Sequence, residues 1–195
     1  MGGVGYFVLA VLALHFLHPD LSVMDDQMSY YALEEFGWLM RSAFAAVGIG
    51  TIAIGWGLNR TLEPGKRVKA SVVMVLIAGV AFVLAGVFNS DPIGETEMST
   101  VGTVHGVASL VVFVFLLIAA WMLRGVFSRD ESWRGFARTQ LWLAVALTVT
   151  FFVVFATPED GSGGLTQRVF VAVMMTWLAL LGWRIREVGA SHTVT

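Results

Sequence analysis

The stretch ASVVMVLIAGVAFVLAGVFNS, residues 70–90, contains 21 consecutive positions without a charge. At a rise of 1.5 Å per residue, about 20 apolar residues in an α-helix cover the roughly 30 Å hydrocarbon core of a bilayer. The stretch is too long for an ordinary strand and too uniformly apolar for a helix on the surface of a soluble protein. A second run of 20 uncharged positions, residues 139–158, has the same character. Both runs predict membrane-spanning helices.

The composition of the whole chain agrees with these two runs. The chain has 195 residues, of which 57% are hydrophobic and 13% charged, and a typical soluble domain is only about 45–50% apolar. The pattern predicts an all-α, polytopic membrane protein in which residues 1–188 form one transmembrane domain and residues 189–195 a disordered polar tail. Six transmembrane helices are expected at about residues 2–18, 36–58, 69–88, 101–123, 139–157 and 168–184.

The basic residues gather on one side of this predicted bundle. Six helices place alternate loops on opposite faces, and ten of the 12 Lys and Arg residues then fall on the same face. The positive-inside rule therefore predicts that both termini are cytoplasmic and that the protein lies in the plasma membrane. Beyond these loops no basic patch favours a nucleic-acid partner, and the loops themselves match anionic lipid head groups.

Each odd-numbered helix is expected to end in a turn that combines proline with an acidic residue. The three turns are HFLHPDLS at 15–22, VFNSDPIG at 87–94 and VFATPEDG at 154–161. Their recurrence indicates a weak internal repeat of three sequential hairpins, each closed on the outer side. The alternative is that proline simply ends a helix at the membrane interface.

Small residues recur along the second, third and fourth helices. They include Gly48, Gly79 and the pair Gly102 and Gly106 of the segment GTVHG. In lipid, small side chains let helix backbones approach closely, so these three helices are expected to pack tightly. A close neighbouring helix would leave His105, between the two glycines of GTVHG, little contact with lipid.

Two residue types add further constraints. The chain contains no cysteine, which excludes disulfides, thiolate chemistry and iron–sulfur ligation by cysteine. Several tryptophans lie near predicted helix ends, as is typical of the aromatic belt at a membrane interface: Trp38, Trp133, Trp142, Trp177 and Trp183.

Three of the four histidines are predicted at similar depth near the outer face. His15 and His18 end the first helix, and His105 lies one turn inside the fourth, beside the turn that contains Asp91. As a metal site, these four residues supply ligands that zinc accepts, and an open position would activate water. As a haem site, His15 and His105 would be the axial ligands. In the third interpretation they are interfacial side chains hydrogen-bonded to acids and backbone, and Asp91 shapes its turn.

Arg41 and Arg168 are the basic exceptions on the acidic outer face. Arg41 lies more than a turn inside the second helix, so its side chain is expected to snorkel toward the head groups. Alternatively it pairs with Asp20 or Asp91. It could also bind an anionic head group in the bidentate manner of guanidinium.

Four segments resemble the DUF998 family of bacterial and archaeal membrane proteins: LHFLHPDLSVMDDQMSYYALEEFGWLMRSAF at 14–44, GVFNSDP at 86–92, STVGTVHGVASL at 99–110 and GGLTQRV at 163–169. The combination F-x-x-D-P…G-x-x-H is the most specific part of the resemblance. The resemblance implies a multi-helix membrane protein with a polar signature at one face, and it implies no particular reaction. Family members usually have Leu-Gly where this chain has Leu33-Glu34, so that turn is expected to differ.

The leading functional hypothesis is a pocket that binds or processes a lipid head group or small polar ligand. It would open to the outside between the first, second, fourth and sixth helices. A serine nucleophile would need His105 within hydrogen-bond reach. One alternative is a non-enzymatic subunit that binds a partner protein or forms a homo-oligomer, and another is a zinc or haem protein. The polar candidates are His15, His18, Asp20, Ser29, Asp91 and His105, with Arg41 and Arg168 as anion contacts.

Overall fold

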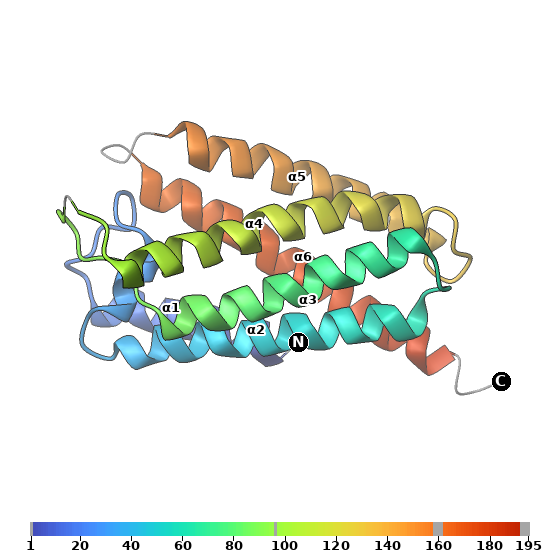
Figure 1. The fold of residues 1–195 in the computed structure, drawn as a ribbon, viewed down its shortest axis with the longest axis horizontal. Coiled ribbons are helices and arrows are strands. Elements are labelled where there is room, and N and C mark those ends of the chain that lie inside the picture. The colour runs from blue at the N-terminus through green and yellow to red at the C-terminus, as the bar shows by residue number, and fades with distance from the viewer. Residues whose placement is uncertain (1, 96, 158–161, 192–195) are drawn as a thin grey trace.

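A computed structural model describes residues 2–95, 97–157 and 162–191. These residues form six α-helices and two short 3₁₀ helices and contain no strand (Figure 1). The elements in chain order are α1 (Gly2–Leu17), η1 (Met28–Ala32), α2 (Gly37–Thr61), α3 (Lys66–Val87), α4 (Thr100–Phe127), η2 (Arg134–Phe136), α5 (Ala137–Ala156) and α6 (Gly163–Ser191).

The helices run up and down as one bundle. The connections from α1 to α2 and from α3 to α4 lie at the same end, as do the end of α5 and the start of α6 (Figure 1). The connections from α2 to α3 and from α4 to α5 lie at the opposite end. The arrangement in sequential hairpins is as predicted, although Pro158, Glu159 and Asp160 of the third turn lie outside the described residues. We refer to the end of the bundle with residues 18–36 as the outer end and to the opposite end as the inner end, after the orientation predicted from the basic residues.

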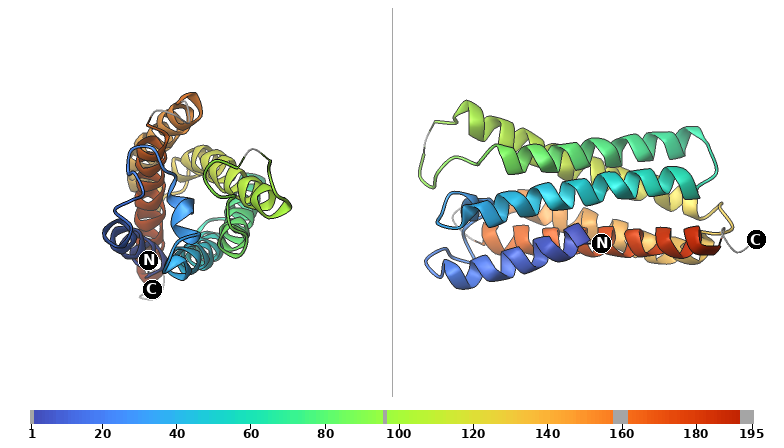
Figure 2. Two further views of the ribbon diagram at one scale, coloured as in Figure 1. Left: turned by 90° about the vertical axis from the view of Figure 1, so that its left-hand side faces the viewer. Right: turned by 90° about the horizontal axis from the view of Figure 1, so that it is seen from below.

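Five of the helices are long and apolar enough to cross a membrane, namely α2 to α6. The chain is therefore a polytopic membrane protein, as its composition predicted. The exception is α1, whose 16 residues rise only about 24 Å, less than the hydrocarbon thickness. Figure 2 shows α1 beginning about halfway along the bundle and reaching its outer end.

The bounds of α6 differ most from expectation. It begins at Gly163 rather than near 168, and it continues through Ser191. Residues 189–191, which we expected in a disordered tail, are therefore helical, and residues 192–195 lie outside the described part of the chain. The early start places Arg168 in the second turn of α6, with one face of the helix toward the first loop.

The helices α2 and α3 pack closely through reciprocal glycines, as the small-residue pattern predicted. A Cβ added to Gly48 would come within 2.7 Å of the carbonyl oxygen of Gly79, and one added to Gly79 within 2.9 Å of that of Gly48. Such distances are below normal van der Waals contact, so neither position has room for a side chain. In contrast, a Cβ at Gly106 would have no neighbour within 4 Å among the described residues.

Two of the tryptophans assigned to the interfacial belt are fully buried instead. Trp133 stacks on Phe127 with ring centroids 4.4 Å apart, and its Nε1–H donates to the carbonyl of Thr61 at 3.2 Å. Trp177 donates to Gln140 Oε1 at 2.9 Å. The belt prediction was wrong for both because each indole N–H has an acceptor inside the protein.

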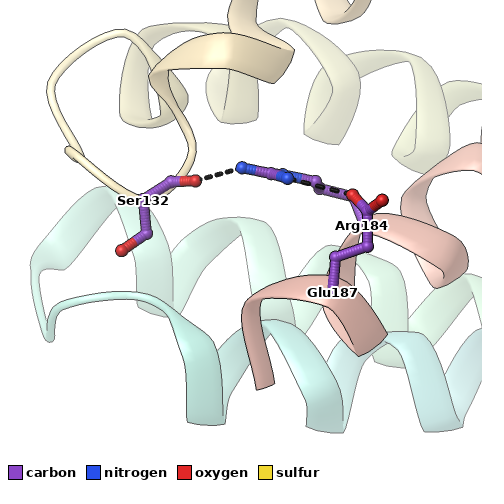
Figure 3. Close-up of polar contacts among 3 residues, drawn as sticks. All are labelled: Ser132, Arg184 and Glu187. Atoms are coloured by element: carbon purple, nitrogen blue, oxygen red, sulfur yellow. Dashed lines mark hydrogen bonds and ion pairs between the residues drawn. The ribbon is translucent and has the colours of Figure 1, made fainter. Parts of the chain in front are cut away.

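Polar contacts also tie the inner end together. Arg184 of α6 donates to the carbonyl of Ser132 in the loop before α5 and to Glu187 Oε2, one turn along its own helix (Figure 3). The contact between Arg184 and Glu187, at 2.9 Å, is the one ion pair among the described residues. The outer end is stabilised by hydrogen bonds, with no ion pair among the described residues there.

Candidate functional site

The first loop, residues 18–36, lies over the outer end of the bundle (Figure 2). Its 3₁₀ helix η1 is mostly buried, with Met28, Ser29, Tyr31 and Ala32 all excluded from solvent. The irregular loop therefore contributes side chains to the interior and acts as a cap over the helices.

Backbone groups of this cap bond to the start of α6. The Leu165 N–H donates to the carbonyl of Met24, and the Met28 N–H donates to Gln167 Oε1, both at 2.9 Å. The first N–H groups of a helix have no acceptor within it, so the Met24 carbonyl of the cap supplies one that lets α6 begin early. Gly164 is required there, because a Cβ would lie 2.5 Å from the carbonyl oxygen of Asp26.

Arg168 anchors the cap through neutral acceptors. Its Nη1 donates to the carbonyls of Asp26 at 2.6 Å and Gly164 at 3.0 Å, and its Nε donates to His15 Nε2 at 3.1 Å. Its Nη2 lies 3.4 Å from the Tyr31 hydroxyl, so one of the five guanidinium N–H groups has no acceptor among the described residues. The carboxylate of Asp26 is directed elsewhere and accepts the Ser22 N–H at 2.7 Å.

His15 has a defined tautomer in this network. Because Nε2 accepts from Arg168, the proton of the neutral ring is on Nδ1, which donates to the carbonyl of Val11 at 2.6 Å. Both ring nitrogens are thus engaged. The arrangement serves to orient the guanidinium rather than to leave a nitrogen lone pair open for a metal ion.

His18 and Asp91, which we grouped with His15, have separate surroundings. The Nε2 of buried His18 bonds to the carbonyl of Glu35 at 2.6 Å. His18 lies near Asp20 and Glu34: a potential ligand atom from each of the three residues lies within 4.8 Å of the other two, and both acids are exposed.

Asp91 binds the start of α4. Its Oδ2 accepts the Ser99 N–H at 3.0 Å and its Oδ1 accepts the Ser99 hydroxyl at 2.5 Å. The Ser99 Oγ in turn accepts the Gly102 N–H at 3.0 Å, so Ser99 is the N-cap of α4.

His105 is held by the end of α3. Its Nδ1 lies 2.8 Å from the carbonyl oxygen of Phe88 and 3.1 Å from that of Ala85. The last carbonyls of a helix receive no hydrogen bond from an N–H of the same helix. A single Nδ1–H shared between the two carbonyls supplies both with a donor. The ring is buried, as its place between two glycines suggested. Its Nε2 therefore carries the lone pair and has no partner among the described residues.

His105 lines a cavity in the outer half of the bundle. We call this space the central cavity. All six α-helices and the cap contribute to its walls, and its volume is about 350 Å³. Most of the walls are aliphatic or aromatic, and none of the lining residues is charged. The polar lining residues are Gln27, Ser29, His105, Ser109 and Gln167.

The central cavity opens between α4 and α5. Four of its lining residues are exposed on the surface: Gly106 and Leu110 of α4, Phe155 of α5 and Gln27 of the cap. Leu110 is 46% exposed and Phe155 is 58% exposed. Both residues lie on membrane-spanning helices, whose exposed sides face lipid. The lining of the cavity therefore reaches the surface at the side of the bundle, between α4 and α5, and also at the cap, beside Gln27.

The predicted polar centre is divided among several places. Among the described residues, His15, His18, Asp91 and His105 do not form one ligand group. Ser29 and His105 line the same cavity, and no hydrogen bond joins them in the part of the chain that the structure describes. Arg41 is exposed and forms no ion pair with Asp20 or Asp91 there.

Sequence reasoning missed the cavity's other polar residues, Ser109 and Gln167. Ser109 lies four residues after His105 and so on the same face of α4, a signal that was available. Gln167 gained its position only through the early start of α6, which the hydropathy pattern did not reveal.

The chain belongs to the DUF998 family, because the family model described as "Protein of unknown function (DUF998)" matches residues 1–184. The match runs from α1 into the last turns of α6, so it confirms the resemblance over nearly the whole chain. Neither the curated proteins nor the solved structures gave a match. The family supports the membrane helix bundle and assigns no reaction to it.

Proposed function

We propose that this DUF998 protein binds an uncharged amphiphile from the surrounding membrane in the central cavity. The observation that carries the proposal is an apolar space bounded by every helix and lined by a buried histidine, His105, whose Nε2 has no partner among the described residues. Cavities with apolar walls and a few placed polar groups are the usual form of small-molecule sites. The proposal retains the binding hypothesis drawn from the sequence and changes its chemistry.

The lining residues favour a neutral head group. The Nε2 of His105 accepts a hydrogen bond, which suits a hydroxyl or amide N–H of the ligand. Ser29, Ser109 and the amide of Gln167 offer further hydrogen bonds without charge. A phosphate or carboxylate would lose its hydration there with no cation to replace it, so a charged head group is disfavoured.

The size of the cavity favours a slender ligand. Its volume of about 350 Å³ is at the lower end of the roughly 300–1,000 Å³ range of ligand pockets. Such a space suits a single acyl or isoprenoid chain with a small head group and is too small for a complete two-chain phospholipid. Entry between α4 and α5 would let the ligand arrive from the bilayer with its head toward the outer face.

The charge distribution supports a location for the central cavity. The basic residues at the inner end support an orientation in which the central cavity lies in the outer leaflet of the plasma membrane. The ligand would thus come from the external side.

Blocking the mouth of the cavity tests the proposal. Gly106→Phe places a ring at the mouth, where an added Cβ has no described neighbour within 4 Å. Gly189→Phe is the matched control, because Gly189 is equally open and lies at the inner end of α6, away from the cavity. Native mass spectrometry of the detergent-purified chain with added monoacylglycerol measures retention.

We expect the wild type and Gly189→Phe to retain monoacylglycerol and Gly106→Phe to lose it. Ser109→Ala should weaken retention by a few-fold, since one hydrogen bond contributes about 0.5–1.5 kcal/mol. Equal retention by all four proteins would contradict the proposal. A stoichiometric partner protein that persists in Gly106→Phe would instead favour the subunit interpretation.

A further inference from the structure

A second apolar space lies between α1 and α6, which we call the α1–α6 groove. Phe7, Met28 and Val171 line both it and the central cavity, so they form the wall between the two. The groove has a volume of about 450 Å³. It faces outward, because Ala172 and Thr176 of its α6 wall are exposed.

The groove has the length of one membrane leaflet. Along α1 it extends from Val4 to His15, and along α6 from Ala179 to Arg168. Each stretch rises about 17 Å, close to half of the roughly 30 Å hydrocarbon core. Its apolar walls run from the middle of the bundle to the outer end, where His15 and Arg168 close it.

Among the described residues, no carboxylate pairs with the positive charge at the outer end of the groove. Arg168 donates to two carbonyls, a neutral histidine and a hydroxyl, and none of these acceptors is a carboxylate. One Nη2–H has no acceptor among the described residues. A partly buried guanidinium without an anion is costly, and its planar array of donors matches phosphate.

We propose that the α1–α6 groove binds an anionic phospholipid, with one acyl chain along the groove and the phosphate against Arg168. The apolar walls favour an acyl chain, and the Nη2–H of Arg168 without a described acceptor favours a negative head group, so an anionic lipid satisfies both at once. This site is separate from the central cavity and differs from it in charge. Because Arg168 also anchors the cap, the bound phosphate would hold the first loop against α6.

Competition between two lipids tests the proposal. The full chain in mild detergent is exposed to equimolar phosphatidylglycerol and phosphatidylcholine, and native mass spectrometry counts the lipids retained. We expect the wild type to prefer phosphatidylglycerol about tenfold, because a hydrogen bond to a charged group contributes about 1.5–3 kcal/mol and 1.4 kcal/mol is a factor of ten. Arg168→Gln should reduce the preference to near parity.

A second variant separates the groove from the cap. Ala172→Phe fills the groove without touching the hydrogen bonds of Arg168, and should lower phosphatidylglycerol retention several-fold. Val169→Phe is its control, since Val169 is exposed on the same helix and does not line the groove. Monoacylglycerol retention should be unchanged in Ala172→Phe, which distinguishes this site from the central cavity.

Two results would overturn the proposal. One is equal retention of the two lipids by the wild type, which would mean that only loosely held boundary lipid is present. The other is a tenfold preference that survives in both Arg168→Gln and Ala172→Phe, which would place the anionic lipid elsewhere on the protein.

Discussion

At the scale of single residues, His15 and His105 show how one residue type takes different roles in similar surroundings. Both rings donate from Nδ1 to backbone carbonyls, His15 to Val11 and His105 to Phe88. Their Nε2 atoms differ, because that of His15 accepts from Arg168 and that of His105 belongs to a cavity-lining residue. The first histidine orients a cation, and in the proposed function the second would accept a hydrogen bond from the ligand.

Removal of the acceptor for Arg168 should destabilise the cap. His15→Phe keeps a ring of similar size but leaves the Arg168 Nε–H without its partner, at a cost of about 1–3 kcal/mol. We expect a lower thermal unfolding midpoint in detergent, followed by tryptophan fluorescence. Leu17→Phe, at an exposed position of the same helix, should leave the midpoint unchanged. An unchanged midpoint in His15→Phe as well would show that the Arg168 bond contributes nothing.

At the scale of elements, α2 and α3 form the most closely packed pair of neighbours. Without hydrophobic driving force between helices in lipid, association depends on van der Waals packing and close backbone approach. Gly48 and Gly79 provide that approach reciprocally. The pair carries Ala85 and Phe88, whose carbonyls hold His105, so its packing positions the site.

Enlarging this contact should separate the two helices. Gly79→Val adds a branched side chain where a Cβ would already lie 2.9 Å from the Gly48 carbonyl oxygen. Overpacking of this kind costs about 1–3 kcal/mol or more, and we expect less folded protein and a lower unfolding midpoint. Gly50→Ala is the control, because a Cβ there has its nearest described neighbour at 3.9 Å. A Gly79→Val protein as stable as the wild type would contradict the close packing.

At the scale of the whole molecule, the hydropathy of the chain predicted the class of fold well. Most of the apolar run that begins at residue 70 lies in α3, and most of the run that begins at residue 139 lies in α5, because length and uniform apolarity permit little else in a bilayer. The shortness of α1 and the bounds of α6 were harder to predict from the sequence. They depend on contacts with the cap, such as the bond from Leu165 to the Met24 carbonyl, which no local pattern reveals.

The candidate site was predictable only in part. Polar residues near the outer end stand out against an apolar background, so His15, His105 and Arg168 were identified from the sequence. Their grouping was not, because depth in the membrane does not tell which face of a helix a side chain occupies. The structure puts His105 beside an uncharged cavity and Arg168 beside a separate groove.

The most direct measurement of the central claim is photo-crosslinking with a monoacylglycerol that carries a diazirine in its chain. Val112 and Met174 line the central cavity and are each only 1% exposed, so lipid at the surface of the bundle cannot reach them. We predict that peptide mass spectrometry finds cross-links at these two residues, and that Gly106→Phe abolishes them. Cross-links confined to exposed positions such as Trp142 and Val80 would contradict a ligand inside the bundle.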